Sequence, residues 1–539
     1  MLRFRMSFSR AAKYALSLLA IAFLALRLIH LSADYPRNIP WDDGVATDEA
    51  WYSSSALNQQ TWHTSLLPGD LNISVVMPIW PCIVEAAFRL CGFSIWTLRS
   101  TAVLFFFLCL LLLCKLLFRY GAGKWVPLFA AMLAVNPWSF ALSRIGFLEF
   151  PMLSFFLLAT ILAANEMEGD DLDGSRFATF RLLLGGMVFT LAVLLKTTAI
   201  VLAPVLIYVI VQQTDFRIGR SLRNAGTLFL GSAAVGIPYW AFYVRRHMDD
   251  VNFYLIGVKS SLRFTLYGFI ADASRPFRSG LGSDHLLFAL ALAVICTSIF
   301  WRKLRTLWKD PLFALSALWL ISFLGFMVKH NYDPVRYYAV TIPATMLLAV
   351  ALLRKMQFTN PRPYKILLSL IAVDMALNAL QVSAAMRRPI YSFHNASIAI
   401  GDIVRQDPSR NDVAIGGNMP EISLQNGLKP VNLLFHSDSI TQQMERYQPG
   451  WWVQAGDDNC FREVLSTAYS AERRGQWEIF YPGKSLTLWK LNKVPNVPLP
   501  VALTPAQTTA CLPPVEDLSK LPSNPSKIQL FAQKLKLLK

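Results

Sequence analysis

The sequence predicts an α-helical polytopic membrane protein, with about eleven transmembrane helices and a small α/β extracytoplasmic C-terminal domain. Of the 539 residues, 54% are hydrophobic, which exceeds the roughly 45–50% of a soluble domain. These residues gather in runs of about 17–22, close to the length that a helix needs to cross a bilayer. Short basic segments separate the runs, and the last part of the chain is polar.

The first predicted span begins at Tyr14, ends near Ser32 and is interrupted by Arg27. A secretory signal peptide has a shorter apolar run, so we interpret this segment as a retained helix. Further apolar runs follow along the chain. We expect them to form spans at 97–118, 124–142, 147–165, 181–196, 199–213, 224–244, 285–302, 311–329, 336–354 and 365–385.

The positions of Lys and Arg orient these spans. With the N-terminus in the cytoplasm, nearly every cytoplasmic connection carries a basic cluster, as the positive-inside rule requires. The net charge is +17. We interpret the Lys and Arg residues behind it as topology determinants and lipid headgroup contacts, and we expect no nucleic acid partner. This topology predicts a multi-pass protein of the plasma or inner membrane, with the first loop and the C-terminal region both extracytoplasmic.

The chain is expected to divide into three parts. Residues 1–388 form a transmembrane domain that includes the first extracytoplasmic loop, 33–96. Residues 389–493 form the α/β domain, because short apolar runs there are bounded by turn residues. Residues 494–539 are a Pro- and Ser-rich tail that ends in a basic amphipathic segment suited to a membrane surface.

The seven cysteines form no metal-ligand pattern. Cys460 and Cys511 lie in the polar C-terminal region. If that region is extracytoplasmic, the two are able to form a disulfide.

Three carboxylates are candidates for chemistry. Asp48 and Glu49 follow Thr47 in the first loop, where such a pair is more often a capped helix start. Glu149 is flanked by apolar residues at a span boundary, and a carboxylate there is costly unless it is paired or reaches water. Arg144, five residues earlier, is the partner that the sequence offers.

Three cations are expected on the same side of the membrane as these acids. Arg144, Lys196 and Arg336 each stand at the end of a predicted span. Individually each is explained as an anchor whose charge reaches the interface. Together with the carboxylates they suit an anionic lipid phosphate and a hydroxyl that loses its proton.

The order of these features resembles the membrane C-type glycosyltransferase superfamily, in its family 39-like branch. That branch includes protein O-mannosyltransferases and the lipid A aminoarabinose transferase. The resemblance covers roughly residues 10–390 and rests on short motifs. They are Asp48-Glu49-Ala50-Trp51-Tyr52, Gly92 to Arg99, Ser143-Arg144 followed by Glu149, Leu195-Lys196-Thr197 and Arg336 to Pro343.

The resemblance implies an inverting transfer of a sugar from a polyprenyl-phosphate donor to a lipid, glycan or protein acceptor. Asp48 would be the general base, and Glu49 or Glu149 would position the acceptor. Asp48 and Glu149 are the ligands if a divalent cation, Mg²⁺ or Mn²⁺, is used. Arg144, Lys196 and Arg336 would hold the donor phosphate.

One departure from the family keeps two alternatives open. Relatives often carry a Lys/His-Pro-Pro segment in the first loop, whereas this chain has Val76-Met77-Pro78-Ile79-Trp80-Pro81. His63 is the nearby residue that could compensate. The alternatives are a transporter or flippase of an anionic lipid or glycan, and a non-catalytic subunit of a complex that assembles an envelope glycan.

Overall fold

The structure is a computed structural model. It describes residues 9–39, 47–164, 172–252, 285–302, 304–329, 335–359, 361–433, 436, 438–456, 468–480 and 484–495. Cys460, Cys511 and the terminal segment 496–539 lie outside the described residues.

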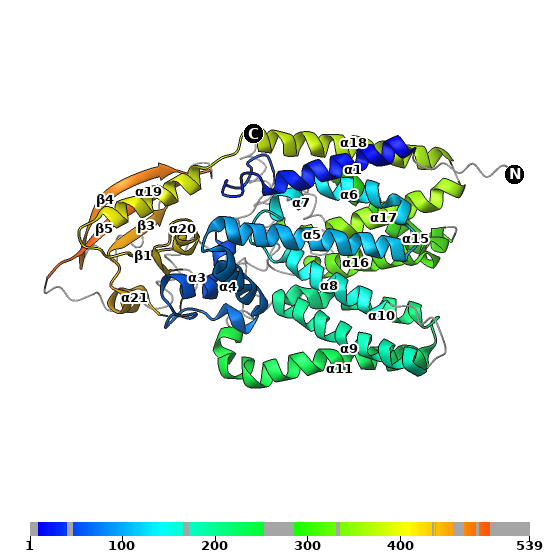
Figure 1. Ribbon diagram of the computed structural model, residues 1–539, viewed down its shortest axis with the longest axis horizontal. Helices are drawn as coiled ribbons and strands as arrows, with labels where there is room; N and C mark the ends of the chain where they lie inside the picture. The colour runs from blue at the N-terminus through cyan, green and yellow to red at the C-terminus, as the bar shows by residue number, and fades with distance from the viewer. Residues whose placement is uncertain are drawn as a thin grey trace, which may run out of the picture.

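A bundle of long helices forms most of the molecule, and its helices run along the long axis (Figure 1). They are α1 (Arg10–Ala25), α5 (Ile95–Arg119), α6 (Val126–Val135), α7 (Pro137–Leu142), α8 (Glu149–Ala163), α9 (Leu172–Leu195), α10 (Ala203–Gln213), α11 (Ile218–Phe242), α15 (His285–Phe300), α16 (Pro311–Lys329), α17 (Thr341–Thr359) and α18 (Pro361–Arg387). Within the described residues, 7 helical segments are long and apolar enough to cross a membrane, and four shorter apolar helices accompany them. The expected count of about eleven spans stays a prediction.

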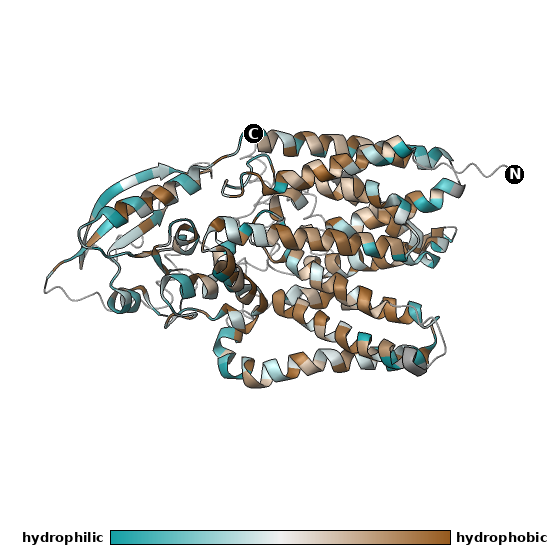
Figure 2. Cartoon of the chain, viewed as in Figure 1, coloured by the Kyte–Doolittle hydropathy of each residue, from teal (hydrophilic) through white to brown (hydrophobic). Residues whose placement is uncertain are grey.

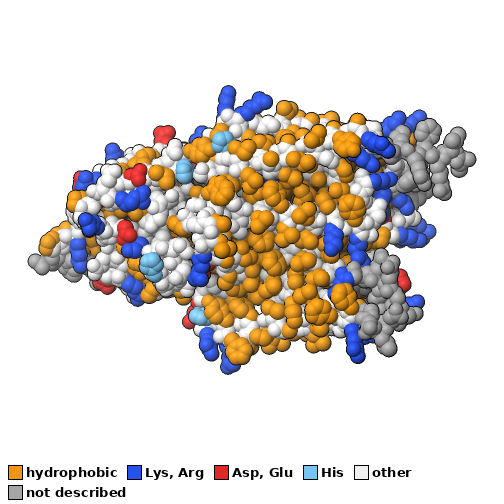
Figure 3. Space-filling view, viewed as in Figure 1, with side chains coloured by type: hydrophobic (Ala, Val, Ile, Leu, Met, Phe, Trp, Pro, Cys, Tyr) orange, Lys and Arg blue, Asp and Glu red, His pale blue; other side chains and the backbone are white. Residues whose placement is uncertain are grey.

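The surface of the bundle is suited to lipid. Apolar residues follow the bundle helices along their length (Figure 2). In the space-filling view, hydrophobic side chains cover the middle of the bundle, and Lys and Arg gather toward its two ends (Figure 3). Large apolar side chains are exposed on this surface, among them Leu104, Leu111, Phe229 and Leu230. A soluble protein rarely exposes so large an apolar area, so the chain is a multi-pass membrane protein.

The span predicted at 124–142 is not one continuous helix. It is divided into α6 and α7 at Asn136, whose backbone is extended (φ −62°, ψ 122°). Pro137 follows and disfavours helical geometry in the residue before it. The Asn136 side chain then accepts a hydrogen bond from the Ser139 backbone N–H at 2.7 Å, which caps α7.

Arg27, the charge within the first apolar run, ties α1 to this break. It is fully buried. Its guanidinium donates to neutral acceptors: the carbonyls of Phe23, Leu133 and Ala134, and the hydroxyls of Ser139 and Ser143, at 2.8–3.3 Å. Because each of its three nitrogens meets an acceptor, the charge joins two elements where it would otherwise disrupt a span.

Two glycines bring α9 and α11 into backbone contact. A Cβ atom added at Gly186 would lie 1.9 Å from the Leu228 carbonyl oxygen, and one at Gly231 would lie 2.0 Å from the Leu183 carbonyl oxygen. Small residues at a helix crossing allow this close approach in membranes. The pair therefore fixes where the two helices cross.

The first loop is folded into short helices, and the first of them begins at Asp48, where the sequence offers a capped helix start. They are α2 (Asp48–Tyr52), α3 (Ser54–Thr61) and α4 (Ile79–Cys91). Helix α4 is amphipathic, because Trp80, Val84 and Phe88 are buried while Glu85 and Arg89 form a partly exposed ion pair. Leu90 is 85% exposed. Such a helix suits a position in the membrane interface.

The C-terminal region contains a five-stranded mixed sheet with helices, which agrees with the small α/β domain that the sequence predicts. The strands are β1 (Val413–Gly416), β2 (Lys429–Asn432), β3 (Trp451–Ala455), β4 (Tyr469–Glu478) and β5 (Ser485–Lys493), in the order β2-β1-β3-β5-β4. Strand β1 pairs in parallel with β2 and β3, and β5 pairs antiparallel with β3 and β4. Helices α19 (Ser392–Gln406), α20 (Met419–Asn426) and α21 (Ile440–Tyr447) accompany the sheet. The expected fold class is confirmed, while the exact domain limits stay a prediction.

The sheet and the first loop lie at the same end of the bundle, opposite the N-terminus (Figure 1). Helix α2 packs against α20. The Trp62 indole N–H of the first loop donates to the Pro430 carbonyl at 3.1 Å. The topology derived from charge requires both parts to be on one side of the membrane, and this contact agrees with it. Which side is extracytoplasmic stays a prediction.

Candidate active site

Asp48 begins the short helix α2 and is almost entirely buried. The Thr47 hydroxyl donates to its carboxylate at 3.1 Å. Its other oxygen forms an ion pair with Arg336, which lies in the 3₁₀ turn Val335–Val340, directly before α17. Two residues 288 apart in the sequence therefore form a buried pair between the first loop and the bundle.

Glu149 and Lys196 form a second buried ion pair. Glu149 is the first residue of α8, where the helix dipole favours a negative charge. Lys196 follows the last residue of α9 and is 3% exposed. One oxygen of Glu149, Oε2, has no hydrogen-bond partner among the described residues. Arg144, which the sequence offered as the partner of Glu149, does not pair with it.

Aromatic rings connect the two ion pairs. The Lys196 ammonium lies 4.2 Å from the ring centroid of Tyr337 and 5.8 Å from that of Tyr52. The Arg336 guanidinium lies 5.7 Å from the same Tyr337 ring. Asp48 and Glu149 both act electrostatically on the Tyr52 hydroxyl. The structure thus brings together Asp48, Glu149, Lys196 and Arg336, which we call the four-charge cluster.

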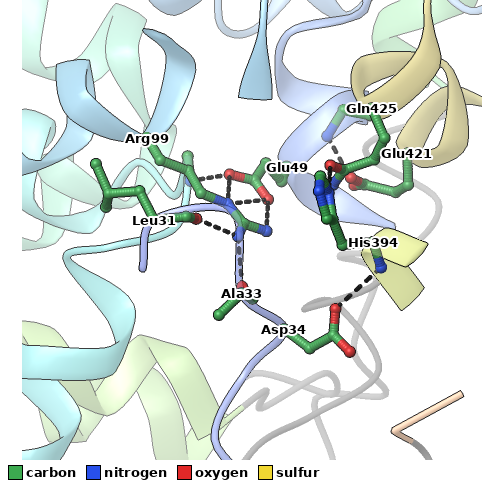
Figure 4. A network of polar contacts seen from close by, with 10 residues as sticks. Leu31, Ala33, Asp34, Glu49, Arg99, His394, Glu421 and Gln425 are labelled. Carbon is green, nitrogen blue, oxygen red and sulfur yellow. Dashed lines mark hydrogen bonds and ion pairs between the residues drawn. The ribbon is translucent and has the colours of Figure 1, made fainter. Parts of the chain in front are cut away.

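Glu49 does not face the four-charge cluster. Its carboxylate accepts two hydrogen bonds from the Arg99 Nε, at 3.0 and 3.1 Å, and a third from Nη2 at 2.8 Å. It also accepts one from the Gly146 backbone N–H at 2.8 Å. Arg99 in turn donates to the carbonyls of Leu31 and Ala33, both at 2.7 Å (Figure 4). Glu49 therefore holds α2 against α5 and the turn before α8.

Gly146 has a steric reason to be glycine. A Cβ atom there would lie 3.1 Å from the Glu49 Cγ and 3.1 Å from the Leu98 Cγ. This separation is tighter than ordinary van der Waals contact. The missing side chain lets the carboxylate of Glu49 reach the backbone, and Asp48 takes its position from that contact.

Arg144 also lies apart from the four-charge cluster. Its guanidinium donates to the carbonyls of Ile29 and His30, the latter at 2.8 Å. Nη1 contacts the Met386 sulfur at 3.4 Å. The expectation that Arg144 joins Lys196 and Arg336 around one phosphate is therefore not supported by their positions. The side chain of Arg144 turns instead toward the end of α18.

Glu421 is a buried acid beside the site that no sequence pattern singles out. It lies in the first turn of α20 and accepts a hydrogen bond from the Ala50 backbone N–H at 2.7 Å. Figure 4 shows it near Glu49. Burial, and then the nearby Glu49 carboxylate, raise the pKa of Glu421 well above its ordinary value. Its signal in the sequence is an acid in the first helical turn after a strand and Gly416-Gly417, and such a signal is common.

The segment that departs from the family also lies beside α2. The Trp80 indole donates to the Ser53 hydroxyl at 3.2 Å and is completely buried. His63 is exposed and has a left-handed backbone (φ 58°). It makes no contact with the four-charge cluster among the described residues. Cys460 and Cys511 lie outside the described residues, so the expected disulfide stays a prediction.

The carboxylates do not form a metal-ligand set as they are arranged. Within the described residues there is no group of three or more His, Cys, Asp or Glu side chains that could hold a metal ion. Asp48 and Glu149 each face a cation, which is the opposite of the oxygen-only environment that Mg²⁺ or Mn²⁺ prefers. Use of a divalent ion stays a prediction.

Comparisons with known proteins bear on the family. Residues 50–251 match the model of the dolichyl-phosphate-mannose-protein mannosyltransferase family. No curated protein sequence matches the chain significantly. The matched segment contains three of the motifs that carry the resemblance, from Gly92–Arg99 to Leu195-Lys196-Thr197, and the end of a fourth, Ala50-Trp51-Tyr52. Asp48 and Glu49 lie just before it.

Solved structures share the fold. The crystal structure of ArnT from Cupriavidus metallidurans in the apo state has a TM-score of 0.58 at 12% identity and covers 89% of this chain and 98% of that one. The structure of the same protein bound to undecaprenyl phosphate has a TM-score of 0.57 at 12% identity, with 88% and 98% covered. At this identity the likeness establishes the fold alone. Together with the match over residues 50–251, it confirms that the chain is a polytopic membrane protein resembling the family 39-like branch of the C-type glycosyltransferases.

Proposed function

We propose that the protein is an inverting glycosyltransferase that moves a sugar from a polyprenyl-phosphate donor to an acceptor hydroxyl. The observation that carries this proposal is the four-charge cluster, in which two carboxylates and two cations share one buried, aromatic-walled site. ArnT, which shares the fold, has been crystallised with undecaprenyl phosphate. That complex supports a lipid phosphate as the carrier.

The two cations are suited to the donor phosphate. As the bond between the sugar and the phosphate breaks, the phosphodiester becomes a phosphomonoester and gains negative charge. Arg336 and Lys196 are buried cations and stabilise that charge strongly, because water does not screen them. Donor binding replaces the Asp48 carboxylate with phosphate oxygens as the partner of Arg336. This exchange frees Asp48 when the substrate is in place.

Asp48 then acts as the general base. It takes the proton of the acceptor hydroxyl while that oxygen attacks the anomeric carbon on the face opposite the phosphate. The new glycosidic bond forms as the carbon–oxygen bond to phosphate breaks, so the configuration inverts and polyprenyl phosphate leaves. Glu149 holds Lys196 and, through Oε2, which has no partner among the described residues, is able to accept a hydrogen bond from the incoming acceptor.

The reaction would occur on the outer face of a plasma or inner membrane, with the N-terminus in the cytoplasm. The donor tail would lie among the apolar side chains of the bundle, and a lipid, glycan or protein acceptor would enter from water. A fixed charge acts most strongly on a reacting group where water is excluded. The buried position of Asp48 therefore supports its role.

The test is transfer by the Asp48→Asn variant. The purified protein in nanodiscs is incubated with a radiolabelled polyprenyl-phosphate sugar, and the release of polyprenyl phosphate is measured. Loss of a general base slows such reactions by about 10²–10⁴-fold. The amide keeps the size of the side chain and an acceptor for Arg336, so we expect this loss of rate with normal folding.

The matched control is Asp402→Asn, because Asp402 lies on α19 and its side chain is 56% exposed. We expect this variant to retain wild-type turnover. Full activity of Asp48→Asn would remove Asp48 from the mechanism.

One observation favours a second candidate, a non-catalytic subunit of a glycan-assembling complex. Relatives place a basic residue before Pro-Pro in the first loop, whereas this chain has Met77 before Pro78. A wild-type protein that binds the donor lipid but releases no polyprenyl phosphate, even by slow hydrolysis, would favour that candidate.

A further inference from the structure

A cavity of about 210 Å³ lies between the first loop and the end of α18. This volume is more than ten times the roughly 10–15 Å³ that a single water needs. Three segments far apart in the sequence line the cavity: residues 30–38 after α1, Arg144 after α7, and residues 384–390 at the end of α18. None of them belongs to the four-charge cluster, so the cavity is a separate feature.

The cavity is rich in positive charge. Arg37, Arg144 and Arg388 line it, together with His30. Within the described part of the chain, none of these three arginines forms an ion pair with a carboxylate, in contrast to Arg99 and Arg336. The Arg37 Nε donates to the Phe480 carbonyl at 2.9 Å, a neutral acceptor. Three uncompensated guanidinium groups around one hollow favour an anion.

Asp34 also lines the cavity, but its charge is directed elsewhere. Its carboxylate accepts hydrogen bonds from the backbone N–H groups of Phe393 and His394 at 2.9 and 3.2 Å, and from the Ser392 hydroxyl at 2.9 Å. It therefore caps the N-terminus of α19, where the helix dipole favours a negative charge. The arginines keep a net positive excess in the cavity.

Arg144 is the buried ligand of this site, since its side chain is nine-tenths buried. Nη2 meets two backbone carbonyls, and the guanidinium lies 5.0 Å from the ring centroid of Phe140. Among the described residues, the acceptor that Nη1 meets is the thioether of Met386 at 3.4 Å, which is a weak one. Nε is buried and has no partner among the described residues. Burying an incompletely paired cation costs free energy, and an oxyanion would supply the missing acceptors.

Arg27 shows what a structural arginine looks like in the same bundle. It is fully buried, and both Nε and its two terminal nitrogens donate to oxygen atoms of Phe23, Leu133, Ala134, Ser139 and Ser143. It does not line this cavity. Arg144, only a turn away from Ser139, has an open cavity and an incomplete set of acceptors instead.

The surroundings of the cavity favour a lipid over a soluble ion. Ala384, Ala385 and Met386 form an apolar wall on one side. Helix α18, which leads to this wall, exposes large apolar side chains along its length, and so does the end of α1. They are Val373, Leu377 and Leu380 on α18, and Leu28 and Ile29 after α1. An acyl chain lying on these surfaces would place its headgroup at the three arginines.

We propose that this cavity binds the phosphate headgroup of a membrane lipid, with Arg144, Arg37 and Arg388 as its ligands. The phosphate oxygens complete the hydrogen bonds of Arg144, and the acyl chains rest against α18 and α1. Charge-assisted bonds from guanidinium to phosphate are among the stronger hydrogen bonds in proteins. The site is distinct from the one proposed for the donor.

The test measures lipid binding and requires neither donor nor turnover. The full-length protein in detergent is titrated by calorimetry with dioctanoyl phosphatidic acid. Parallel titrations use dioctanoyl phosphatidylcholine, whose headgroup is zwitterionic, and inorganic phosphate alone. We expect saturable binding of phosphatidic acid that is at least tenfold tighter than that of the other two. Equal affinity for inorganic phosphate would overturn the lipid assignment.

Two neighbouring arginines provide matched variants. Arg388→Gln removes a cavity ligand, and Arg387→Gln removes an adjacent exposed charge that does not line the cavity. A hydrogen bond to a charged group is worth about 1.5–3 kcal/mol, so we expect Arg388→Gln to weaken binding about tenfold or more. Arg387→Gln should change it less than threefold. Equal effects of the two would overturn the proposal.

The double variant Glu149→Gln/Lys196→Met separates this inference from the proposed function. It lacks one of the two cations proposed for the donor phosphate but keeps the arginines of the cavity. We expect it to bind phosphatidic acid like the wild type. Loss of binding in this variant would place the lipid in the donor site and overturn a separate cavity site.

Discussion

At the scale of single residues, the site consists of charges that are already paired. Asp48 faces Arg336 and Glu149 faces Lys196, and the four side chains are at most 9% exposed. A buried ion pair is not a strong source of stability, because removing both charges from water offsets most of their attraction. Breaking such a pair is costly, since one charge is then left buried alone. We therefore interpret these pairs as a preformed binding site for a charged substrate.

The Glu149→Gln variant tests this interpretation. It leaves the Lys196 ammonium buried without its counterion, which typically costs about 3–5 kcal/mol. We expect a clear drop in the thermal unfolding temperature in a single detergent. The double variant Glu149→Gln/Lys196→Met removes both charges and should recover most of the stability, but not the transfer activity.

The control is an ion pair that is exposed to solvent. Lys429 and Asp412 lie 3.2 Å apart, with side chains 35% and 45% exposed. Exposed pairs contribute about 0–1 kcal/mol, so Lys429→Met should hardly change the unfolding temperature. An equal loss in Lys429→Met and Glu149→Gln would contradict the buried-pair argument.

At the scale of elements, α20 and α2 form one unit although they lie far apart in the sequence. Helix α20 starts just after the carboxyl end of β1 and points its first turn at the backbone of α2, where Glu421 accepts the Ala50 N–H. On the other side of α2, Glu49 is held by Arg99. The helix that carries Asp48 is therefore clamped between α5 and the C-terminal region.

The pH dependence of this clamp follows from Glu421. Its pKa is raised in the folded protein by burial and by Glu49, so the folded state binds its proton more tightly than the unfolded chain does. Stability then falls as the pH rises above the ordinary carboxyl pKa. Glu421→Gln does not titrate and keeps an oxygen for Ala50, so its unfolding temperature should fall less than that of the wild type between pH 5 and pH 8.

The comparison variant is Glu445→Gln, which removes an exposed acid on α21. It should follow the wild-type pH profile. If Glu421→Gln is less stable than the wild type at pH 8, the clamp needs the charged carboxylate and the expected direction of the pH effect is wrong.

At the scale of the whole molecule, the first loop and the C-terminal region meet along a seam of polar groups. The Asp70 carboxylate accepts from Asn58 at 3.1 Å and lies 3.6 Å from the His436 Nε2. Arg446 and Asp438 form an ion pair at 2.6 Å nearby. Burial lowers the pKa of His436 to about 4, so this histidine is neutral at pH 7. The seam is thus a second place where the C-terminal region is held to the first loop.

Asp70 makes this seam sensitive to pH. Burial, with a smaller contribution from Asp438, raises the pKa of Asp70 to about 7. The folded state therefore loses stability as the pH rises from about 4 to about 7, by a few kcal/mol at most. Asp70→Asn keeps an acceptor for Asn58 and cannot ionise. We expect it to match the wild type near pH 4 and to exceed its unfolding temperature at pH 8.

Hydrogen exchange offers an independent measurement of the seam. Amide protection at residues 429–432 should decrease in the wild type between pH 5 and pH 8, after correction for intrinsic rates, and should stay level in Asp70→Asn. A seam that opens equally in both proteins would show that Asp70 does not control it.

The sequence by itself determined the features that depend on local composition. Run length and apolar content predict the bundle, since a helix must be long and apolar enough to cross lipid. Alternating apolar runs and turn residues predict the small sheet. Glu149, Lys196 and Arg336 could be selected because charges at the ends of apolar spans are costly without a purpose. Asp48, in the first loop, was selected by the family resemblance.

Only the tertiary structure decided which charges meet. The sequence offered Arg144 as the partner of Glu149, but Glu149 pairs with Lys196, which is 47 residues away, and Arg144 lines a different cavity. Glu421 contacts α2 although the two are 371 residues apart in the sequence. The residues next to Glu421 in the sequence do not predict that contact. The physical reason is the distance over which each effect depends on other parts of the chain. The hydropathy of a segment acts through that segment's own contact with lipid or water. An ion pair needs two side chains within about 4 Å, and folding alone brings such side chains together.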